Sequence, residues 1–119
     1  MLTFIDIEAD NVVGIRVDGK ISGQEFDAVA ALLEKKMKDH SKVRIYAELA
    51  PWKGITLEAL MKDLRFGLSN WKRFDKEAVV TEKKWIKRWA EIGDKMIGSI
   101  EVKAFPFEKK EEAKQWIQE

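Results

Sequence analysis

The stretch Val43-Arg44-Ile45-Tyr46-Ala47-Glu48-Leu49 decides the fold, because it has the pattern of a mostly apolar strand that opens directly into a loop. That loop is Ala50-Pro51-Trp52-Lys53-Gly54, and a helical pattern follows it from Thr56. In α/β sheets, binding sites gather where a strand ends and the chain turns into a helix. The loop carries a tryptophan and a lysine but no serine, cysteine or histidine, so its chemistry favours binding over catalysis.

Outward from this strand, the hydrophobic pattern predicts the element order ββαβαβαβα. Strands are expected at 3–8, 12–17, 43–49, 77–81 and 99–105, and helices at 22–38, 56–71, 82–97 and 108–118. Strands that alternate with helices imply parallel pairing, whereas the turn signal Asp10-Asn11 implies an antiparallel hairpin for the first two. The sequence therefore predicts one α/β domain over residues 1–119, a mixed sheet of about five strands with about four helices.

Two polar residues are expected to mark the ends of the first helix. Ser22 stands three residues before Glu25, which is the spacing of a capping box at a helix N-terminus. His40 stands at the other end, where a C-terminal capping role suffices to explain it. It is the single histidine of the chain.

Bulk properties restrict the class of protein. The 119 residues are 45% hydrophobic and 36% charged, with a net charge of +1, which is typical of a soluble globular domain and gives no overall field that recruits nucleic acid or membrane. With no cysteine and one histidine, we expect neither disulfides nor a transition-metal site, and no cofactor motif is present. No signal peptide or membrane span is visible, so the expected location is cytoplasmic.

Three features of the chain together resemble a known family. They are Val17-Asp18-Gly19-Lys20-Ile21 before the first helix, the strand at 43–49, and the helices that follow the later strands. This arrangement, over nearly the whole chain, resembles the STAS fold of anti-sigma-factor antagonists, and within it the SpoIIAA-like bacterial proteins. The shared motifs belong to the fold, and none is a catalytic signature.

The resemblance implies two kinds of function. In anti-sigma-factor antagonists, a serine at the start of the second helix, usually after an aspartate, is phosphorylated by a partner kinase. This chain has Gly54-Ile55-Thr56-Leu57-Glu58 there, so Thr56 is the only nearby hydroxyl, and a helix N-cap role is the favoured interpretation. The SpoIIAA-like branch implies instead binding of an apolar or carboxylate-bearing small molecule, with membrane contact.

Five tryptophans are the compositional oddity of the chain, and two of them lie in a basic segment. Trp85 and Trp89 are one helical turn apart, so their rings can adjoin. The basic residues interleaved with them are Lys83, Lys84, Lys87 and Arg88. One interpretation is a surface helix whose indoles sit at a lipid interface or cover a ligand, while lysines attract anionic headgroups. The other is a tryptophan face packed on the sheet, with solvated lysines outside.

The loop after the central strand is the second candidate site. Trp52 is expected either to cap a cleft between the second and third helices or to serve as an apolar plug or dimer contact. Lys53 would either pair with a ligand carboxylate at the helix N-terminus or remain solvated. The apolar stripe of the second helix, with Leu57, Leu60 and Met61, is expected in the core, where its inward part can also wall a pocket.

These patterns predict a non-enzymatic ligand-binding or sensor domain for an apolar or amphipathic small molecule, peripheral on the inner face of the membrane. Its ligand-binding residues are predicted to be Trp52, Lys53, Leu57, Leu60, Met61, Trp85 and Trp89. Its membrane contacts are predicted to be Lys83, Lys84, Trp85, Lys87, Arg88 and Trp89. The alternative is a protein-interaction module of the anti-sigma-factor-antagonist type. A homodimer is also compatible with surplus apolar surface.

Overall fold

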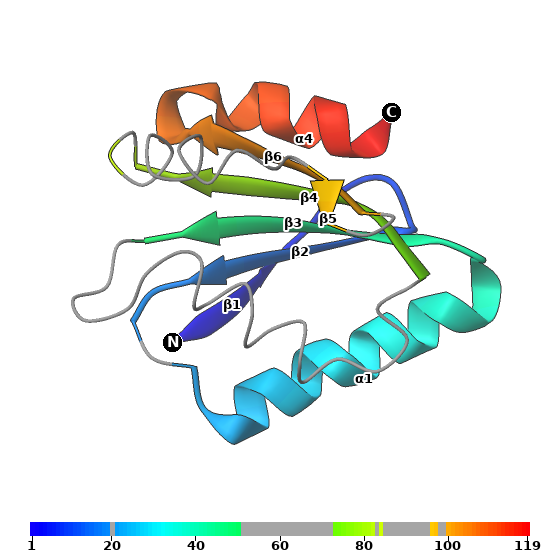
Figure 1. Ribbon diagram of the computed structural model, residues 1–119. Helices are drawn as coiled ribbons and strands as arrows, with labels where there is room; N and C mark the ends of the chain where they lie inside the picture. The colour runs from blue at the N-terminus through cyan, green and yellow to red at the C-terminus, as the bar shows by residue number, and fades with distance from the viewer. Residues whose placement is uncertain (20, 51–72, 83, 85–95, 98–99) are drawn as a thin grey trace.

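The computed structural model describes residues 1–19, 21–50, 73–82, 84, 96–97 and 100–119 (Figure 1). Its strands are β1 (Leu2–Ile5), β2 (Val12–Val17), β3 (Val43–Leu49), β4 (Phe74–Thr81), β5 (Met96–Ile97) and β6 (Ile100–Pro106). Its helices are α1 (Gly23–Asp39), the 3₁₀ turn η2 (Phe107–Lys109) and α4 (Lys110–Gln118). The six strands form one mixed sheet in the order β1-β2-β3-β4-β6-β5.

The pairing directions agree with the sequence pattern. β2, β3, β4 and β6 run parallel to one another, while β1 is antiparallel to β2 and forms the predicted hairpin with it. All five predicted strands are present, although β1 ends at Ile5 and β4 begins at Phe74, three residues earlier than expected. The mixed α/β sheet is therefore confirmed.

The helices required one correction. The first and last predicted helices are confirmed as α1 and α4, and these are the two α-helices of the described residues, where four were predicted for the chain. The prediction that the third helix ends at Ile97 is wrong, because Met96 and Ile97 form β5 and pair antiparallel with β6. Gly98-Ser99 stands between β5 and β6, and such dipeptides favour hairpins over helix ends. Of the other residues of the two middle predicted helices, Glu82 is not helical and Lys84 is helical, and the rest lie outside the described residues.

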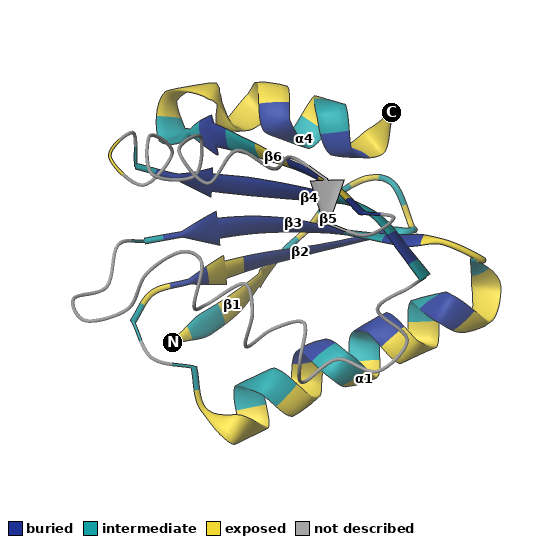
Figure 2. Cartoon of the chain, viewed as in Figure 1, coloured by how far each residue is buried: buried dark blue, intermediate teal, exposed yellow. Residues whose placement is uncertain are grey.

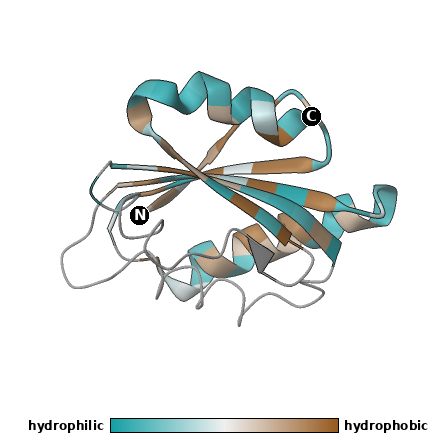
Figure 3. Ribbon diagram, turned by 45° about the horizontal axis from the view of Figure 1, so that its top comes forward, coloured by the Kyte–Doolittle hydropathy of each residue, from teal (hydrophilic) through white to brown (hydrophobic). Residues whose placement is uncertain are grey.

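The two helices cover opposite faces of the sheet (Figures 1 and 3). On β3, Val43, Ile45, Ala47 and Leu49 belong to the core that contains Val29, Leu33 and Met37 of α1. The alternate residue Tyr46 belongs to a second core, which contains Ala113 and Ile117 of α4. β3 is therefore buried on both faces (Figure 2), as expected of a central parallel strand.

A register shift between β3 and β4 sets which side chains of β4 face each core. Val43 pairs with Phe74 and Arg44 pairs with Lys76, so Asp75 is the extra residue of the β4 strand. Such an extra residue reverses the alternation beyond it. The Asp75 carboxylate accepts from Arg44 Nε at 3.1 Å, and Arg44 Nη1 donates to the Ile117 carbonyl of α4 at 2.8 Å. One guanidinium thus holds β3, β4 and α4 together.

Both ends of α1 are tied to the sheet. At the N-terminus the predicted capping box is confirmed, since Ser22 accepts from the backbone N–H of Glu25 and the Glu25 carboxylate accepts from that of Ser22. The other Glu25 oxygen accepts from the backbone N–H of Leu2, which attaches β1 to the start of the helix. Because these backbone hydrogen bonds favour the charged form, the pKa of Glu25 is lowered.

At the other end, Arg73 donates to the His40 carbonyl at 2.6 Å and to the Ser41 carbonyl at 3.2 Å, which satisfies acceptors just beyond the last turn. His40 is the C-cap residue, as predicted. Its ring Nε2 also lies 2.8 Å from Asp10 Oδ2, a contact that the sequence did not indicate. This hydrogen bond, with the nearby Lys36 charge, lowers the pKa of Asp10. The turn between β1 and β2 is thereby held to α1.

We predict that Gly14→Ala destabilises the fold and that Gly23→Ala does not. A Cβ at Gly14 would collide with the Ile5 carbonyl and lie 2.9 Å from Ile7 Cγ1, whereas a Cβ at Gly23 meets nothing within 4 Å. Overpacking at Gly14 should reduce the free energy of unfolding by about 1–3 kcal/mol. Alanine at Gly23, in the first turn of α1, should instead raise it by up to about 1 kcal/mol. Urea denaturation of both variants measures the difference, and equal effects would contradict the packing at Gly14.

Candidate functional site

The carboxyl ends of four parallel strands define one edge of the sheet. β2, β3, β4 and β6 end there at Val17, Leu49, Thr81 and Pro106, and their arrowheads point the same way in Figure 1. The candidate loop begins at this edge with Ala50, whose backbone N–H donates to the Val17 carbonyl at 2.9 Å. This bond continues the pairing between β2 and β3 beyond Leu49. The start of the loop is therefore fixed to the sheet.

A buried carboxylate lies two residues before that loop. Glu48 is 5% exposed, and its Oε2 accepts from the Tyr46 hydroxyl at 2.8 Å. Its Oε1 accepts from Arg16 Nη1 at 3.3 Å, and Arg16 is also its register partner on β2. Burial of an unpaired charge is costly, so the two hydrogen bonds explain how Glu48 is tolerated there. The Arg16 side chain is 49% exposed, which leaves this ion pair open to water on one side.

Tyr46 donates the shorter of these hydrogen bonds from inside the α4 core. It is fully buried and packs in the cluster of Val12, Ala78, Val80 and Phe105. Burial, together with the hydrogen bond to Glu48 and the charge of that carboxylate, raises the pKa of Tyr46. The hydroxyl therefore stays protonated through neutral pH and keeps its role as a donor.

A second buried polar group joins β4 to β3 at the same edge. Thr81 is fully buried, and its hydroxyl donates to the Leu49 carbonyl at 3.0 Å. By strand alternation, Thr81 shares the face of Val79 in the α1 core, and Glu48 shares the face of Tyr46 in the α4 core. The two groups therefore brace the end of β3 from both faces. The hydrogen bonds of Glu48 and Thr81 together give rigid support at the point where the chain leaves β3.

Most of the predicted site residues fall outside the described parts of the chain. Those residues are Trp52, Lys53, Thr56, Leu57, Leu60, Met61, Lys83, Trp85, Lys87, Arg88 and Trp89. Lys84, a predicted membrane contact, is described and exposed. The structure thus places the start of the candidate loop and one lysine, and the remaining assignments stay predictions.

The interaction of Tyr46, Glu48 and Arg16 was missed as a structural unit. Alternation along β3 puts Tyr46 and Glu48 on one face, so their contact was readable from the sequence. The contribution of Arg16 was not, because it depends on the register between β2 and β3. Among the described residues, there is no group of three histidine, aspartate or glutamate side chains that could hold a metal. None of the helices in the same parts of the chain is long and apolar enough to cross a membrane.

Comparisons with known proteins give one family match and one similar fold. A family model described as SpoIIAA-like matches residues 12–118. Among solved structures, the chain is similar to an uncharacterized protein of the DUF3478 family with a SpoIIAA-like fold from Shewanella loihica PV-4. That similarity has a TM-score of 0.59 and 22% identity, and it covers 98% of this chain and 92% of the other. At this identity it carries the fold alone. No curated protein matches the sequence.

We predict that Tyr46→Phe lowers the free energy of unfolding by about 1–3 kcal/mol, because it removes the donor to a buried carboxylate. The ring keeps its packing, so the loss isolates the hydroxyl. Urea denaturation at neutral pH measures it. A variant as stable as the parent protein would mean that water or another group replaces the hydroxyl at Glu48.

The pH dependence gives an independent test of the same hydrogen bond. Because the pKa of Tyr46 is higher in the folded than in the unfolded chain, its contribution to stability is complete below about pH 10 and is lost as the pH rises further. Tyr46 is the single tyrosine, so the ultraviolet absorbance of tyrosinate reports this group alone. We expect tyrosinate to appear only as the protein unfolds in alkali. Ionisation near the ordinary pKa in a folded protein would contradict the burial of Tyr46.

Proposed function

Because the chain belongs to the SpoIIAA-like family, we propose that it is a non-enzymatic binding domain for an apolar or amphipathic small molecule. The observation that carries the proposal is the common edge at which β2, β3, β4 and β6 end. At this edge β3 leads into Ala50, and the sequence then supplies Trp52 and Lys53. Carboxyl ends of parallel strands are the usual location of ligand sites in α/β sheets.

The hydrogen bonds at this edge support binding over catalysis. A general acid or base must be free to exchange a proton with its substrate. Both oxygens of Glu48 already accept hydrogen bonds, and the Thr81 hydroxyl donates to a backbone carbonyl. These groups brace the strand ends, and a rigid support is what a precise binding site requires.

The proposed ligand chemistry follows from the residue types of the loop and the segments after it. Trp52 supplies a large apolar surface, and Lys53 supplies a cation for a ligand carboxylate. The apolar walls of the proposed site are Leu57, Leu60, Met61, Trp85 and Trp89. A fatty acid or a similar amphipathic carboxylate combines the two features and is the ligand class that we propose.

The same proposal extends to the membrane surface. We propose that Lys83, Lys84, Lys87 and Arg88 attract anionic headgroups while the neighbouring indoles enter the interface. The exposure of Lys84 is consistent with such a contact. A peripheral position at the membrane would give the domain access to amphipathic ligands, which partition there.

We predict that Trp52→Ala weakens fatty-acid binding at least about tenfold, or 1.4 kcal/mol, because it removes one of the three indoles that supply apolar surface to the proposed site. Titration followed by tryptophan fluorescence measures the affinity, and native mass spectrometry of the purified protein reports any ligand already bound. The control is Trp116→Phe, since Trp116 lies in the α4 core beside Lys76 and should leave affinity unchanged. Absence of both a bound ligand and a fluorescence response would remove the small-molecule proposal. A stable complex with a kinase-like protein instead would favour the antagonist-type alternative.

We predict that the double variant Lys83→Glu/Lys87→Glu lowers binding to phosphatidylserine vesicles at least about tenfold, since each lysine near an anionic surface contributes about 1 kcal/mol. Co-sedimentation at constant ionic strength measures it. The matched control is Lys35→Glu/Lys38→Glu, which makes the same charge change at exposed positions of α1. Equal losses in the two variants would show that net charge alone acts, and no binding by the parent protein would exclude the membrane contact.

A further inference from the structure

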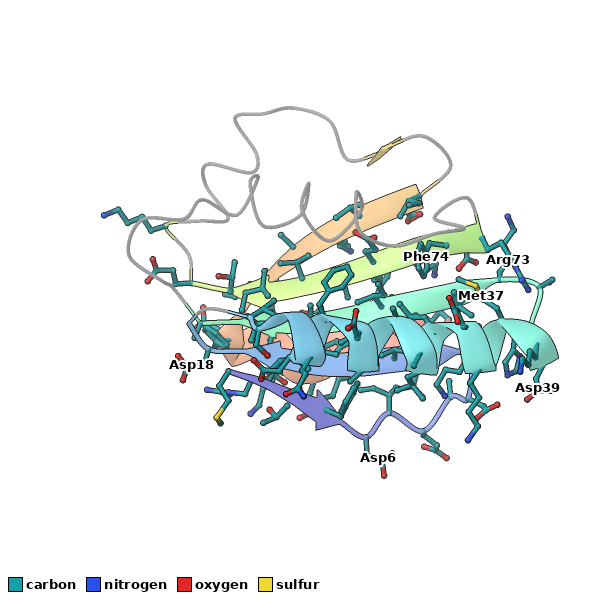
Figure 4. All side chains as sticks on the ribbon, turned by 90° about the horizontal axis from the view of Figure 1, so that it is seen from below. Asp6, Asp18, Met37, Asp39, Arg73 and Phe74 are labelled. Atoms are coloured by element: carbon teal, nitrogen blue, oxygen red, sulfur yellow. The ribbon has the colours of Figure 1, made fainter. Side chains whose placement is uncertain are left out.

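The outer edge of β1 has both an unpaired strand edge and exposed apolar side chains. β1 ends the sheet, with β2 on its inner side and no described strand on its outer side (Figure 4). Within the described parts of the chain, the exposed large hydrophobic residues are Met1, at 67%, and Phe4, at 49%, and both belong to this edge. Unpaired edges that carry apolar side chains are templates for a further strand.

The hydrogen-bond pattern identifies which backbone groups point outward. Met1 and Asp18 exchange both of their backbone hydrogen bonds, so the antiparallel alternation makes Thr3 and Ile5 the next residues bonded to β2. The backbone groups of Leu2 and Phe4 therefore point away from the sheet. The Leu2 N–H confirms this direction, because it donates outward to Glu25 of α1. The Leu2 carbonyl and both backbone groups of Phe4 remain directed at the outer edge.

We propose that β1 of a second copy of this chain pairs with this edge, antiparallel about a two-fold axis at Phe4. In this register the two Phe4 residues exchange N–H and carbonyl groups, and the Leu2 carbonyl accepts from the Asp6 N–H of the second copy. Glu25 keeps the Leu2 N–H, which disfavours any register centred closer to the N-terminus. The two Phe4 rings then lie opposite each other on the face shared with Leu2, as a cross-strand aromatic pair.

Asp6 disfavours a register centred farther along the chain. Asp6, labelled at the outer edge in Figure 4, lies opposite Leu2 of the second copy, beside the Glu25 carboxylate that binds the Leu2 N–H, and this like-charge contact weakens the pairing. At about 3.4 Å per residue, the two Asp6 carboxylates are then about 14 Å apart along the strands, beyond the screening length of about 8 Å at physiological salt. A register centred on Asp6 would instead bring these carboxylates together. Because β1 spans only Leu2–Ile5, the interface is small and the dimer should be weak and concentration-dependent.

A single cysteine tests the geometry directly, since the chain contains none. In a hydrogen-bonded antiparallel pair the two Cα atoms are about 5.5 Å apart, within the range of about 4.4–6.8 Å that a disulfide spans. Phe4→Cys should therefore form an intermolecular disulfide in a glutathione buffer at least about tenfold faster than Thr3→Cys. Thr3 is the control because it lies opposite Ile5 of the second copy and on the other face. Equal rates for the two variants would overturn the proposal.

Two further variants test the pairing without any crosslink. Phe4→Pro removes an N–H that β2 does not use, so the hairpin should persist, as prolines do on the open side of edge strands. Phe4→Lys places like charges directly opposite each other across the two-fold axis. Each should raise the dimer dissociation constant at least about tenfold in sedimentation equilibrium, with an unchanged circular dichroism spectrum. A parent protein that stays monomeric at about 1 mM, or a dimer unaffected by Phe4→Lys, would overturn the proposal.

Discussion

The structure depends on the burial of β3, a strand with neighbours on both sides and a core on each face, in which every residue but Arg44 is buried. Burial on both faces forces every polar side chain of the strand to find a partner within the protein. At one end of β3, Arg44 bonds to Asp75 and to the last turn of α4. At the other end, Glu48 accepts hydrogen bonds from Tyr46 and Arg16. The same pairs that satisfy β3 therefore attach α4, fix the register with β4 and hold the strand end from which the candidate loop leaves.

The sequence predicts those parts of the fold whose signal lies within a few neighbouring residues, and misses those that depend on distant strands. The capping box of Ser22 and Glu25 and the period of the central strand lie within a few residues, and both were read correctly. The β5 strand was read as the end of a helix, because two apolar residues carry no period of their own. The register shift at Asp75 and the ion pair of Arg16 with Glu48 depend on alignment between distant strands, which no local pattern encodes.

The same difference between local and long-range signals applies to the candidate site. The loop after β3 was predicted as a site from its position and its residue types, and the structure shows that its first residue, Ala50, is hydrogen-bonded to the end of β2. The role of Glu48 was not predicted, because the sequence does not reveal that Tyr46 and Arg16 occupy both of its oxygens. Because both oxygens accept hydrogen bonds, Glu48 is better understood as part of the support beneath the proposed binding surface than as a reactive group.

The two edges of the sheet differ in how they limit further pairing. β5 has only two residues, and a strand that short offers little for another chain to extend. β1 is longer, yet Glu25 occupies its first outward N–H, and Asp6 and Glu8 follow its end with negative charge. A two-fold pairing at Phe4 would consume the remaining outward groups on both copies at once, so the contact closes on itself. At the β1 edge the protein can therefore associate in pairs, and this contact leaves no open side of β1 from which a longer assembly could grow.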